Sequence, residues 1–436
     1  MPLRYEPRRK CATAQGPKSM FEGLFLSVAI VLALGSYTAV VRGRSLGWFV
    51  PLWFLVSLAA TELAPWLLAT ILSTALAMAL FADLSLASMQ FALALLLGSA
   101  LAILKVLLAH FETGRSFERA LKTGLGENFE QSIPIERRRQ LSHQISAEGW
   151  SHPVTFTRPG VRLERDIAYG DAGKRNLLDI YRPIVAGENC PVLLQIHGGA
   201  WLFGHKAEQA LPLLHHMAGL GWVCVSINYR LSPAATFPDH IVDVKKAIVW
   251  VRENIAQWGG DPRFIAVTGG SAGGHLASLA ALSQNHKPWQ PGFEDKDTSI
   301  QAAMPLYGAY DLCDRYNIRH YTGIDNPVLE RVMKTTQAQA PELYDSASPI
   351  TWVSDKAPPF FVIQGTHDTL VWVEEARRFV AELSAASSAE IVYAELNGAQ
   401  HSFDTVHSPR TAHFMNAAAW WLEWSRANWL EAQSVD

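Results

Sequence analysis

The sequence has 436 residues, too many for one core of ordinary size, and its formal net charge is −3. The charge is uneven, because residues 1–20 carry five basic side chains and one acidic one, residues 21–109 are almost uncharged, and the remainder is acidic. A nucleic-acid-binding protein would be basic on its folded part, so this distribution argues against that class. The four cysteines lie far apart with no Cys-x-x-Cys pair, which argues against a zinc site and a disulfide framework.

Residues 21–109 form an apolar block that we expect to cross a membrane. The run 21–41 has the length of about 20 residues that a spanning helix needs, and it is too long and too closely followed by apolar sequence to favour a cleaved signal peptide. Acidic and proline breaks at 60–66 and 81–85 divide the rest into expected spans at 46–62, 64–82 and 86–109. Three spans are the alternative, because the turns between four helices would be very tight. Four would place the basic tail 1–20 and the basic residues after 109 together in the cytoplasm, so we expect four transmembrane helices, contact with membrane lipid and a cytoplasmic globular part.

The polar stretch 110–165 is interpreted as a connector or cap, and residues 166–436 as an α/β domain. Short apolar runs alternate there with helix-length amphipathic segments such as 239–260, in which Ile241, Val244 and Ile248 share one helical face. Strands that are apolar along their whole length are covered on both faces, which predicts a mostly parallel sheet. The proline-containing stretch 309–358 breaks the alternation, and we expect a helical lid insertion there. The expected strands are 176–183, 191–198, 222–230, 263–270, 300–308, 359–365 and 389–396.

Four glycines surround Ser271 in the segment TGGSAGGHLASL (268–279). Residues 269–273 match G-x-S-x-G, directly after the expected strand and directly before a helical run. That context is the one a nucleophile elbow requires, since a sharp turn projects the serine hydroxyl above the sheet and leaves no room for side chains beside it. The pattern therefore predicts Ser271 as a nucleophile.

Two later positions supply the partners that a weakly nucleophilic serine hydroxyl needs. Asp368 follows the expected strand 359–365, and His401 lies in the loop after the strand 389–396. The order serine, aspartate, histidine along the chain is the order found in α/β-hydrolases. We therefore predict His401 as the general base and Asp368 as the residue that orients it. The alternatives left open are Glu374 or Asp404 as the acid and His367 or His407 as the base.

A glycine pair after the strand 191–198 predicts an oxyanion site. In QIHGGAWLFG (195–204), the backbone N–H groups of Gly198 and Gly199 could join that of Ala272 around a developing negative charge, and losing one such donor costs about 3–4 kcal/mol. His197 is expected to orient this loop. The glycines at 269–274 lack the Lys-Ser/Thr of a P-loop, and the pair 215–216 lacks the spacing of a zinc motif, so we expect no metal and no cofactor.

These motifs together resemble the hormone-sensitive-lipase-like esterases of the α/β-hydrolase group. The resemblance runs from about Asp166 to the C-terminus and implies the same serine, histidine, aspartate and oxyanion roles. Two positions depart from the family pattern, since Gly270 stands where aspartate is frequent and Ala200 where a third glycine is usual. DVKKAIVWVRENI (243–255) and PGFEDKDTSIQAAMPLYGAYDL (291–312) further resemble bacterial membrane-anchored lipases and esterases that carry several N-terminal helices, consistent with the apolar block. The segments that carry the match are HGGAW (197–201), INYRLSP (227–233), FPDHIVDV (237–244), GGDP (259–262), GGSAGGHLA (269–277), GTHDTLV (365–371) and HSF (401–403).

The resemblance implies a membrane-anchored serine hydrolase that cleaves carboxylic esters through an acyl-enzyme. We expect a small-molecule or lipid-derived ester as substrate, and the sequence does not predict the oligomeric state. The motif HGGAW is also similar to that of isoprenylcysteine methylesterases and kynurenine formamidases, so amide or thioester cleavage is an alternative. A non-catalytic ligand receptor or membrane scaffold on the same fold is another. The expected walls of the substrate pocket are Trp201, Phe203, Tyr229 and Tyr310.

Overall fold

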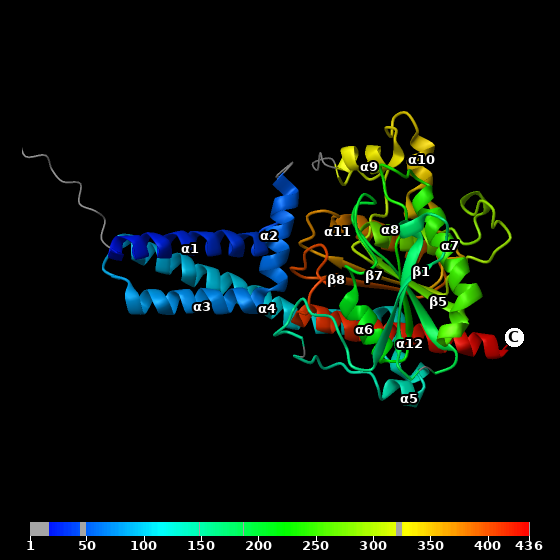
Figure 1. The fold of residues 1–436 in the computed structure, drawn as a ribbon, viewed down its shortest axis with the longest axis horizontal. Helices are drawn as coiled ribbons and strands as arrows, with labels where there is room; N and C mark the ends of the chain where they lie inside the picture. The colour runs from blue at the N-terminus through cyan, green and yellow to red at the C-terminus, as the bar shows by residue number, and fades with distance from the viewer. Residues whose placement is uncertain (1–16, 44–48, 148, 186, 320–324, 436) are drawn as a thin grey trace, which may run out of the picture.

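The computed structural model describes residues 17–43, 49–147, 149–185, 187–319 and 325–435. It shows a bundle of apolar helices that projects from one side of a larger α/β domain (Figure 1). The bundle contains α1 (Pro17–Val40), α2 (Val50–Glu62), α3 (Ala64–Phe81) and the first half of α4 (Ala87–Leu125). Short helices η2 (Phe129–Ser132) and α5 (Ile135–Arg138) then lead into the α/β domain.

The α/β domain is built on one eight-stranded sheet in the order β1-β2-β4-β3-β5-β6-β7-β8. The six strands from β4 to β8 run parallel, while β2 is antiparallel to both of its neighbours, β1 and β4. The expected mostly parallel α/β sheet is therefore confirmed. The strands are β1 (Val161–Ala168), β2 (Leu177–Pro183), β3 (Cys190–Ile196), β4 (Val223–Ile227), β5 (Gly260–Gly270), β6 (Ala302–Leu306), β7 (Phe360–Gly365) and β8 (Ile391–Leu396).

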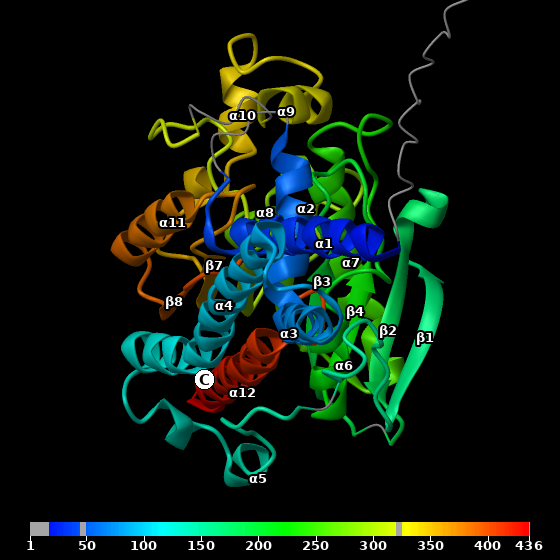
Figure 2. The same cartoon turned by 90° about the vertical axis from the view of Figure 1, so that its left-hand side faces the viewer.

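Helices cover both faces of the sheet, and each central strand sends alternate side chains into two separate cores. On β3, Leu194 packs in the core beneath α7, α8 and α11, while its neighbour Leu193 packs in the core beneath α6 and α12. Figure 2 shows α12 lying beside α4 at the edge of the domain. The helices of the domain are α6 (Leu211–Gly219), α7 (Asp239–Asn254), α8 (Ala272–Leu282), α9 (Asp325–Met333), α10 (Pro341–Ser346), α11 (Val373–Ala386) and α12 (Pro409–Val435), with short helices η3 (Gly173–Asn176), η4 (Ile255–Trp258), η5 (Lys287–Trp289) and η6 (Pro349–Trp352).

Three helices of the described chain are long and apolar enough to span a membrane, where four were expected. The spanning candidates are α1, α3 and α4, and the helix expected at 46–62 is the 13-residue α2. Thirteen helical residues extend about 20 Å, which is shorter than a hydrocarbon core of about 30 Å. In Figure 1, α2 runs across the ends of α1 and α3 instead of alongside them.

The boundary expected between residues 109 and 110 falls inside α4, which is continuous for 39 residues. Buried residues continue at helical spacing through Val106, His110, Thr113 and Phe117, while the charged side chains of Glu112 and Arg115 are exposed on the outer face. The helix thus begins in the bundle and ends in the core of the α/β domain.

Candidate active site

Ser271 lies at the sharp turn between β5 and α8. Its backbone has φ 58° and ψ −123°, a conformation that residues other than glycine rarely adopt and that costs about 1–3 kcal/mol. The Ser271 N–H donates to the carbonyl oxygen of Leu306 at 3.0 Å, which ties the turn to the end of β6. A strained serine between a strand and a helix is the geometry of a nucleophile elbow.

The glycines beside Ser271 are required by close backbone contacts. A Cβ at Gly273 would lie 2.0 Å from the carbonyl oxygen of Ile196, and one at Gly269 would lie 2.6 Å from the same atom. At Gly270, a Cβ would lie 2.5 Å from the hydroxyl of Tyr307. Tyr307 therefore fills the space that a larger side chain at 270 would need.

Asp368 and His401 form a buried, hydrogen-bonded pair. His401 Nδ1 lies 2.7 Å from Asp368 Oδ2, and Gln364 Nε2 donates to the same oxygen at 2.9 Å. The other oxygen, Oδ1, accepts the backbone N–H groups of Leu370 and Val371, each at 2.8 Å. Four donors thus hold the carboxylate in place, and the His401 ring is oriented by a fixed acceptor.

The side chain of Gln400 joins the loops that carry Asp368 and His401. Its Oε1 accepts the backbone N–H of Thr369 and that of His401, each at 2.9 Å. Its Nε2 donates to Ser57 Oγ of α2 at 3.1 Å. The sequence analysis did not identify Gln400, because nothing in a lone glutamine beside a histidine indicates a bridging role.

Ser271 and His401 line one cavity of about 270 Å³, in which Gly198 and Gly199 also lie. Among the described residues no hydrogen bond joins the Ser271 hydroxyl to His401, although the two residues face the same space. Catalytic hydrogen bonds are often long before a substrate is bound, so the arrangement allows proton transfer between them.

The three expected oxyanion donors differ in their surroundings. The N–H of Gly198 donates to Gln209 Oε1 at 2.6 Å, so this donor is engaged within the protein. Gly199 lines the cavity and has a φ of 116°. Ala272 is the first residue of α8, and the backbone N–H groups of the first helical turn have no acceptor within the helix. A Cβ at Gly199 would lie 2.1 Å from the carbonyl oxygen of Phe203, which explains the glycine.

Only one of the four expected pocket walls lies on the cavity. Phe203 lines it, but the other three side chains pack in the hydrophobic core. Trp201 donates its Nε1 to His275 Nδ1 at 3.2 Å, Tyr229 donates its hydroxyl to the carbonyl of His197 at 3.0 Å, and Tyr310 stacks on Phe379. The structure therefore does not place Trp201, Tyr229 and Tyr310 on this cavity, because these large aromatic groups fill the interior of the domain.

The cavity has walls that the sequence analysis missed. Phe54 and Leu58 reach it from α2, and Leu370 and Tyr307 reach it from the α/β domain. No described residue of the expected lid 309–358 lines the cavity, and Tyr307, which does, directly follows β6 and precedes that segment. The helical segment that contributes to the cavity thus comes from the N-terminal bundle.

The competing acids and bases have other partners. Tyr307 donates to Asp404 Oδ1, and burial raises the pKa of both groups. His197 donates its Nδ1–H to the carbonyl of Gly198 at 2.8 Å, and burial lowers its pKa to about 4, so the ring is neutral at pH 7. His367 contacts the Thr366 hydroxyl at 3.2 Å. The remaining candidates, Glu374 and His407, lie on α11 and beside Phe156, outside the cavity.

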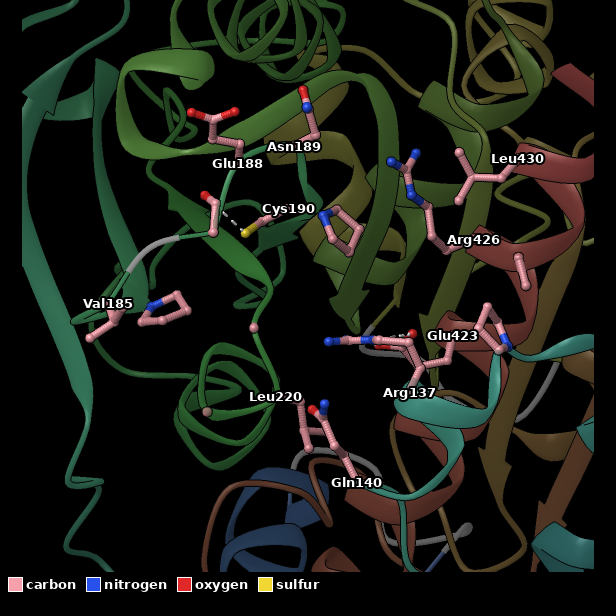
Figure 3. Close-up of a pocket in the computed structure, with 17 residues that line it drawn as sticks. Arg137, Gln140, Val185, Glu188, Asn189, Cys190, Leu220, Glu423, Arg426 and Leu430 are labelled. Carbon is pink, nitrogen blue, oxygen red and sulfur yellow. Dashed lines mark hydrogen bonds and ion pairs between the residues drawn. The ribbon is translucent and has the colours of Figure 1, made fainter. Parts of the chain in front are cut away.

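A larger cavity of about 510 Å³ lies elsewhere, between the start of β3 and the end of α12 (Figure 3). Three of its charged side chains are already paired within the protein, because Arg137 donates to Glu423 and Arg426 donates to Asp261. We therefore assign no chemistry to it. Among the described residues, no group of three or more His, Cys, Asp or Glu side chains is arranged to hold a metal ion.

Comparison with known proteins gives the family. The chain is 45% identical over 331 residues to the probable carboxylic ester hydrolase LipM of Mycobacterium tuberculosis, covering 72% of this chain and 73% of that protein. The chain belongs to the α/β-hydrolase family of carboxylic ester hydrolases. The esterase is also 51% identical over 249 residues to the esterase LipQ of the same organism, covering 56% of this chain and 58% of that protein. The BD-FAE family matches its residues 178–383.

Solved structures show the same fold. A truncated form of a carbohydrate esterase from gut microbiota superposes with a TM-score of 0.51 at 24% identity, covering 63% of this esterase and 100% of that chain. The recognition made from the motifs around 197–201 and 269–277 is therefore confirmed at the level of family and fold.

Proposed function

We propose that this esterase cleaves carboxylic esters through a covalent intermediate on Ser271, with His401 as general base and acid and Asp368 as the residue that orients it. The observation that carries the proposal is the cavity shared by a strained Ser271 and by His401, whose Nδ1 is bonded to Asp368. Membership of an ester hydrolase family supports the same chemistry.

In the first half-reaction, Ser271 Oγ attacks the ester carbonyl carbon while His401 Nε2 takes the hydroxyl proton. The carbonyl oxygen becomes an oxyanion, for which we propose the N–H groups of Gly199 and Ala272 as donors. The N–H of Gly198 would join them only when Gln209 Oε1 releases it. Collapse of the intermediate breaks the ester C–O bond, and His401 returns the proton to the leaving alcohol.

In the second half-reaction, water replaces the alcohol. His401 Nε2 takes a proton from the water, the resulting hydroxide attacks the acyl carbon, and Ser271 leaves with that proton as the free hydroxyl. The Asp368 carboxylate, held by hydrogen bonds from Gln364, Leu370 and Val371, stabilises the imidazolium form of His401.

We further propose that α1, α3 and α4 anchor the esterase in a membrane. All three are long and apolar enough, and the bundle projects away from the α/β domain (Figure 1). Three crossings place the start of α1 and the α/β domain on opposite sides. With three crossings, each side of the membrane has five Lys and Arg residues near the spans. The excess of basic residues on the cytoplasmic side, which favoured a cytoplasmic α/β domain with four helices, is then absent. Reporter fusions after residues 20 and 436 would give opposite sides for three crossings and the same side for four.

A fluorophosphonate probe tests the nucleophile directly. We expect covalent labelling of the wild-type chain, and loss of both labelling and ester hydrolysis in Ser271→Ala. Labelling that persists in this variant would refute the assignment, and a folded wild-type protein that is neither labelled nor active would favour a ligand receptor.

Matched substrates test the bond that is cleaved. We expect kcat/KM for a p-nitrophenyl ester to exceed that for the p-nitroanilide with the same acyl group. Equal or faster cleavage of the anilide would make amide hydrolysis, the formamidase-like alternative, the main activity.

A further inference from the structure

Helix α2 forms part of the cavity that contains Ser271 and His401. Phe54 and Leu58 line this cavity, and the Phe54 ring lies edge-on to His401, with 5.9 Å between ring centroids. We infer that α2 is a substrate-binding wall of the active site and that it admits long-chain esters directly from the lipid surface. This inference rests on the proposed function of Ser271.

The inner face of α2 is fixed to the α/β domain by buried polar contacts. Ser57 Oγ accepts from Gln400, the residue that holds the backbone of His401. Five residues on, Glu62 forms an ion pair with Arg410 and accepts a hydrogen bond from Ser408 at 2.9 Å. The Glu62 and Arg410 side chains are 2% and 0% exposed. These contacts bridge more than 340 residues of sequence and hold Phe54 and Leu58 in position.

The outer face of α2, formed by Leu52, Leu55, Val56 and Ala59, is apolar and exposed. Leu52 and Leu55 are 61% and 59% exposed, and the spacing of these residues places them on one side of the helix. The only charged residue of α2, Glu62, points inward to Arg410. An exposed apolar face of this kind marks contact with another apolar phase.

The lipid surface is the occupant that fits this face. The helix lies between two helices that could span a membrane, α1 and α3, and crosses their ends (Figure 1). It is too short to span a bilayer itself, so a position in the plane of the interface buries its outer face in lipid and turns its inner face to the active site. One helix thus contacts the membrane on one side and the reacting groups on the other.

The cavity itself points to the class of substrate. Its apolar walls are Phe54, Leu58, Phe203 and Leu370, and its volume of about 270 Å³ is small compared with typical ligand pockets of about 300–1,000 Å³. A long acyl chain does not fit inside this volume. The carbonyl group of a long-chain ester can reach Ser271 while its acyl chain lies along Phe54 and Leu58 and continues into the lipid. Such an ester contacts the apolar walls, and only part of its chain has to fit inside the cavity.

Chain-length preference tests the wall. The protein in lipid vesicles is assayed with p-nitrophenyl butyrate and p-nitrophenyl palmitate, and the readout is the ratio of their kcat/KM values. We expect Phe54→Ala and Leu58→Ala each to lower the palmitate-to-butyrate ratio about tenfold, the usual effect of removing apolar contacts to a substrate. The control is Leu55→Ala, which makes the same leucine-to-alanine change on the outer face of α2. We expect it to leave the palmitate-to-butyrate ratio within twofold of wild type.

Two outcomes overturn this inference while leaving the proposed function intact. One is a ratio within twofold of wild type in both inner-face variants, with Ser271 still labelled by the fluorophosphonate. The other is an equal loss on both esters, which indicates general damage to the site. A wild-type protein that neither reacts with the probe nor cleaves either ester refutes the proposed function instead.

Photocrosslinking tests the contact with lipid. The photoreactive residue p-benzoylphenylalanine is introduced at position 55 or at position 58, and the vesicles are irradiated. We expect adducts with phospholipid acyl chains from position 55 in clear excess over position 58. Equal yields, or no lipid adducts from position 55, would contradict a lipid-facing outer surface.

Discussion

The buried ion pair between Glu62 and Arg410 provides a sharp test of how the bundle is joined to the α/β domain. Replacing Glu62 with leucine leaves the Arg410 guanidinium, which is 0% exposed, without its carboxylate, and also removes the acceptor of Ser408. Breaking a buried pair in this way costs about 3–5 kcal/mol. For a domain of this size each kcal/mol lowers the melting temperature by roughly 2 °C, so we expect a fall of about 6–10 °C.

Thermal inactivation of detergent-solubilised protein measures this effect, with residual ester hydrolysis as the readout. The double variant Glu62→Leu/Arg410→Met should recover most of the loss, since two apolar groups replace both charges. Glu118→Leu is the matched control, because its pair with Lys122 is largely exposed and contributes at most about 1 kcal/mol. A Glu62→Leu shift no larger than that of the control, or no recovery in the double variant, would refute the reasoning.

Three further predictions concern the site and its support. Asp368→Asn should lower kcat about 10³–10⁴-fold with little change in KM, because the His401 ring loses the acceptor that fixes its orientation; a loss below tenfold in steady-state assays would be inconsistent with the assigned role. Gly273→Ala should abolish activity and lower the melting temperature, since its Cβ would meet a backbone oxygen at 2.0 Å, whereas Gly98→Ala, with open space around it, should change neither. Burial lowers the pKa of three histidines to about 4 in the folded protein, so the unfolded chain binds protons first as the pH falls below 6.5. The free energy of unfolding should therefore decrease between pH 6.5 and 4, by about 1.4 kcal/mol per pH unit for each of these histidines. Melting curves that do not change between pH 7 and 5 would contradict this for His197, His240 and His275.

The parts of the fold that the sequence predicted are those determined by local pattern. All seven expected strands are present, because a run of apolar residues between turn signals forms a strand wherever both faces are covered. The missed strand, β1, pairs only with β2 at the edge of the sheet. Its residues are all half-buried or exposed and include Arg162, Glu164 and Asp166, so its sequence resembles the polar connector before it.

The site was predictable where chemistry restricts the residue type. Ser271 is surrounded by glycines because backbone atoms approach within 3 Å, and that crowding is visible in the sequence. The walls were not predictable, because aromatic residues near a motif fill cores as readily as pockets. Trp201 lies within HGGAW and Tyr229 within INYRLSP, yet both side chains are buried in the core.

The contribution of α2 could not be read from local pattern, since it depends on contacts across more than 300 residues. One signal was present, namely Glu62 at the end of an apolar run. A carboxylate in such a position needs a buried partner, and the sequence analysis treated it only as a break between spans. The tertiary contact with Arg410 holds this end of α2 at the surface of the α/β domain, while Pro65 favours the break before α3.

Helix α4 joins the bundle to the α/β domain without an intervening hinge. Its 39 residues extend about 58 Å, with Met89 and Leu96 packed at one end and Phe117 and Leu121 at the other. In the membrane-anchored arrangement proposed above, the number of residues in this helix therefore sets both the height of the reaction centre above the bilayer and its rotation about the helix axis. Each residue added between the two packed ends would raise the domain by about 1.5 Å and turn it by about 100°, which would swing the cavity mouth away from the membrane.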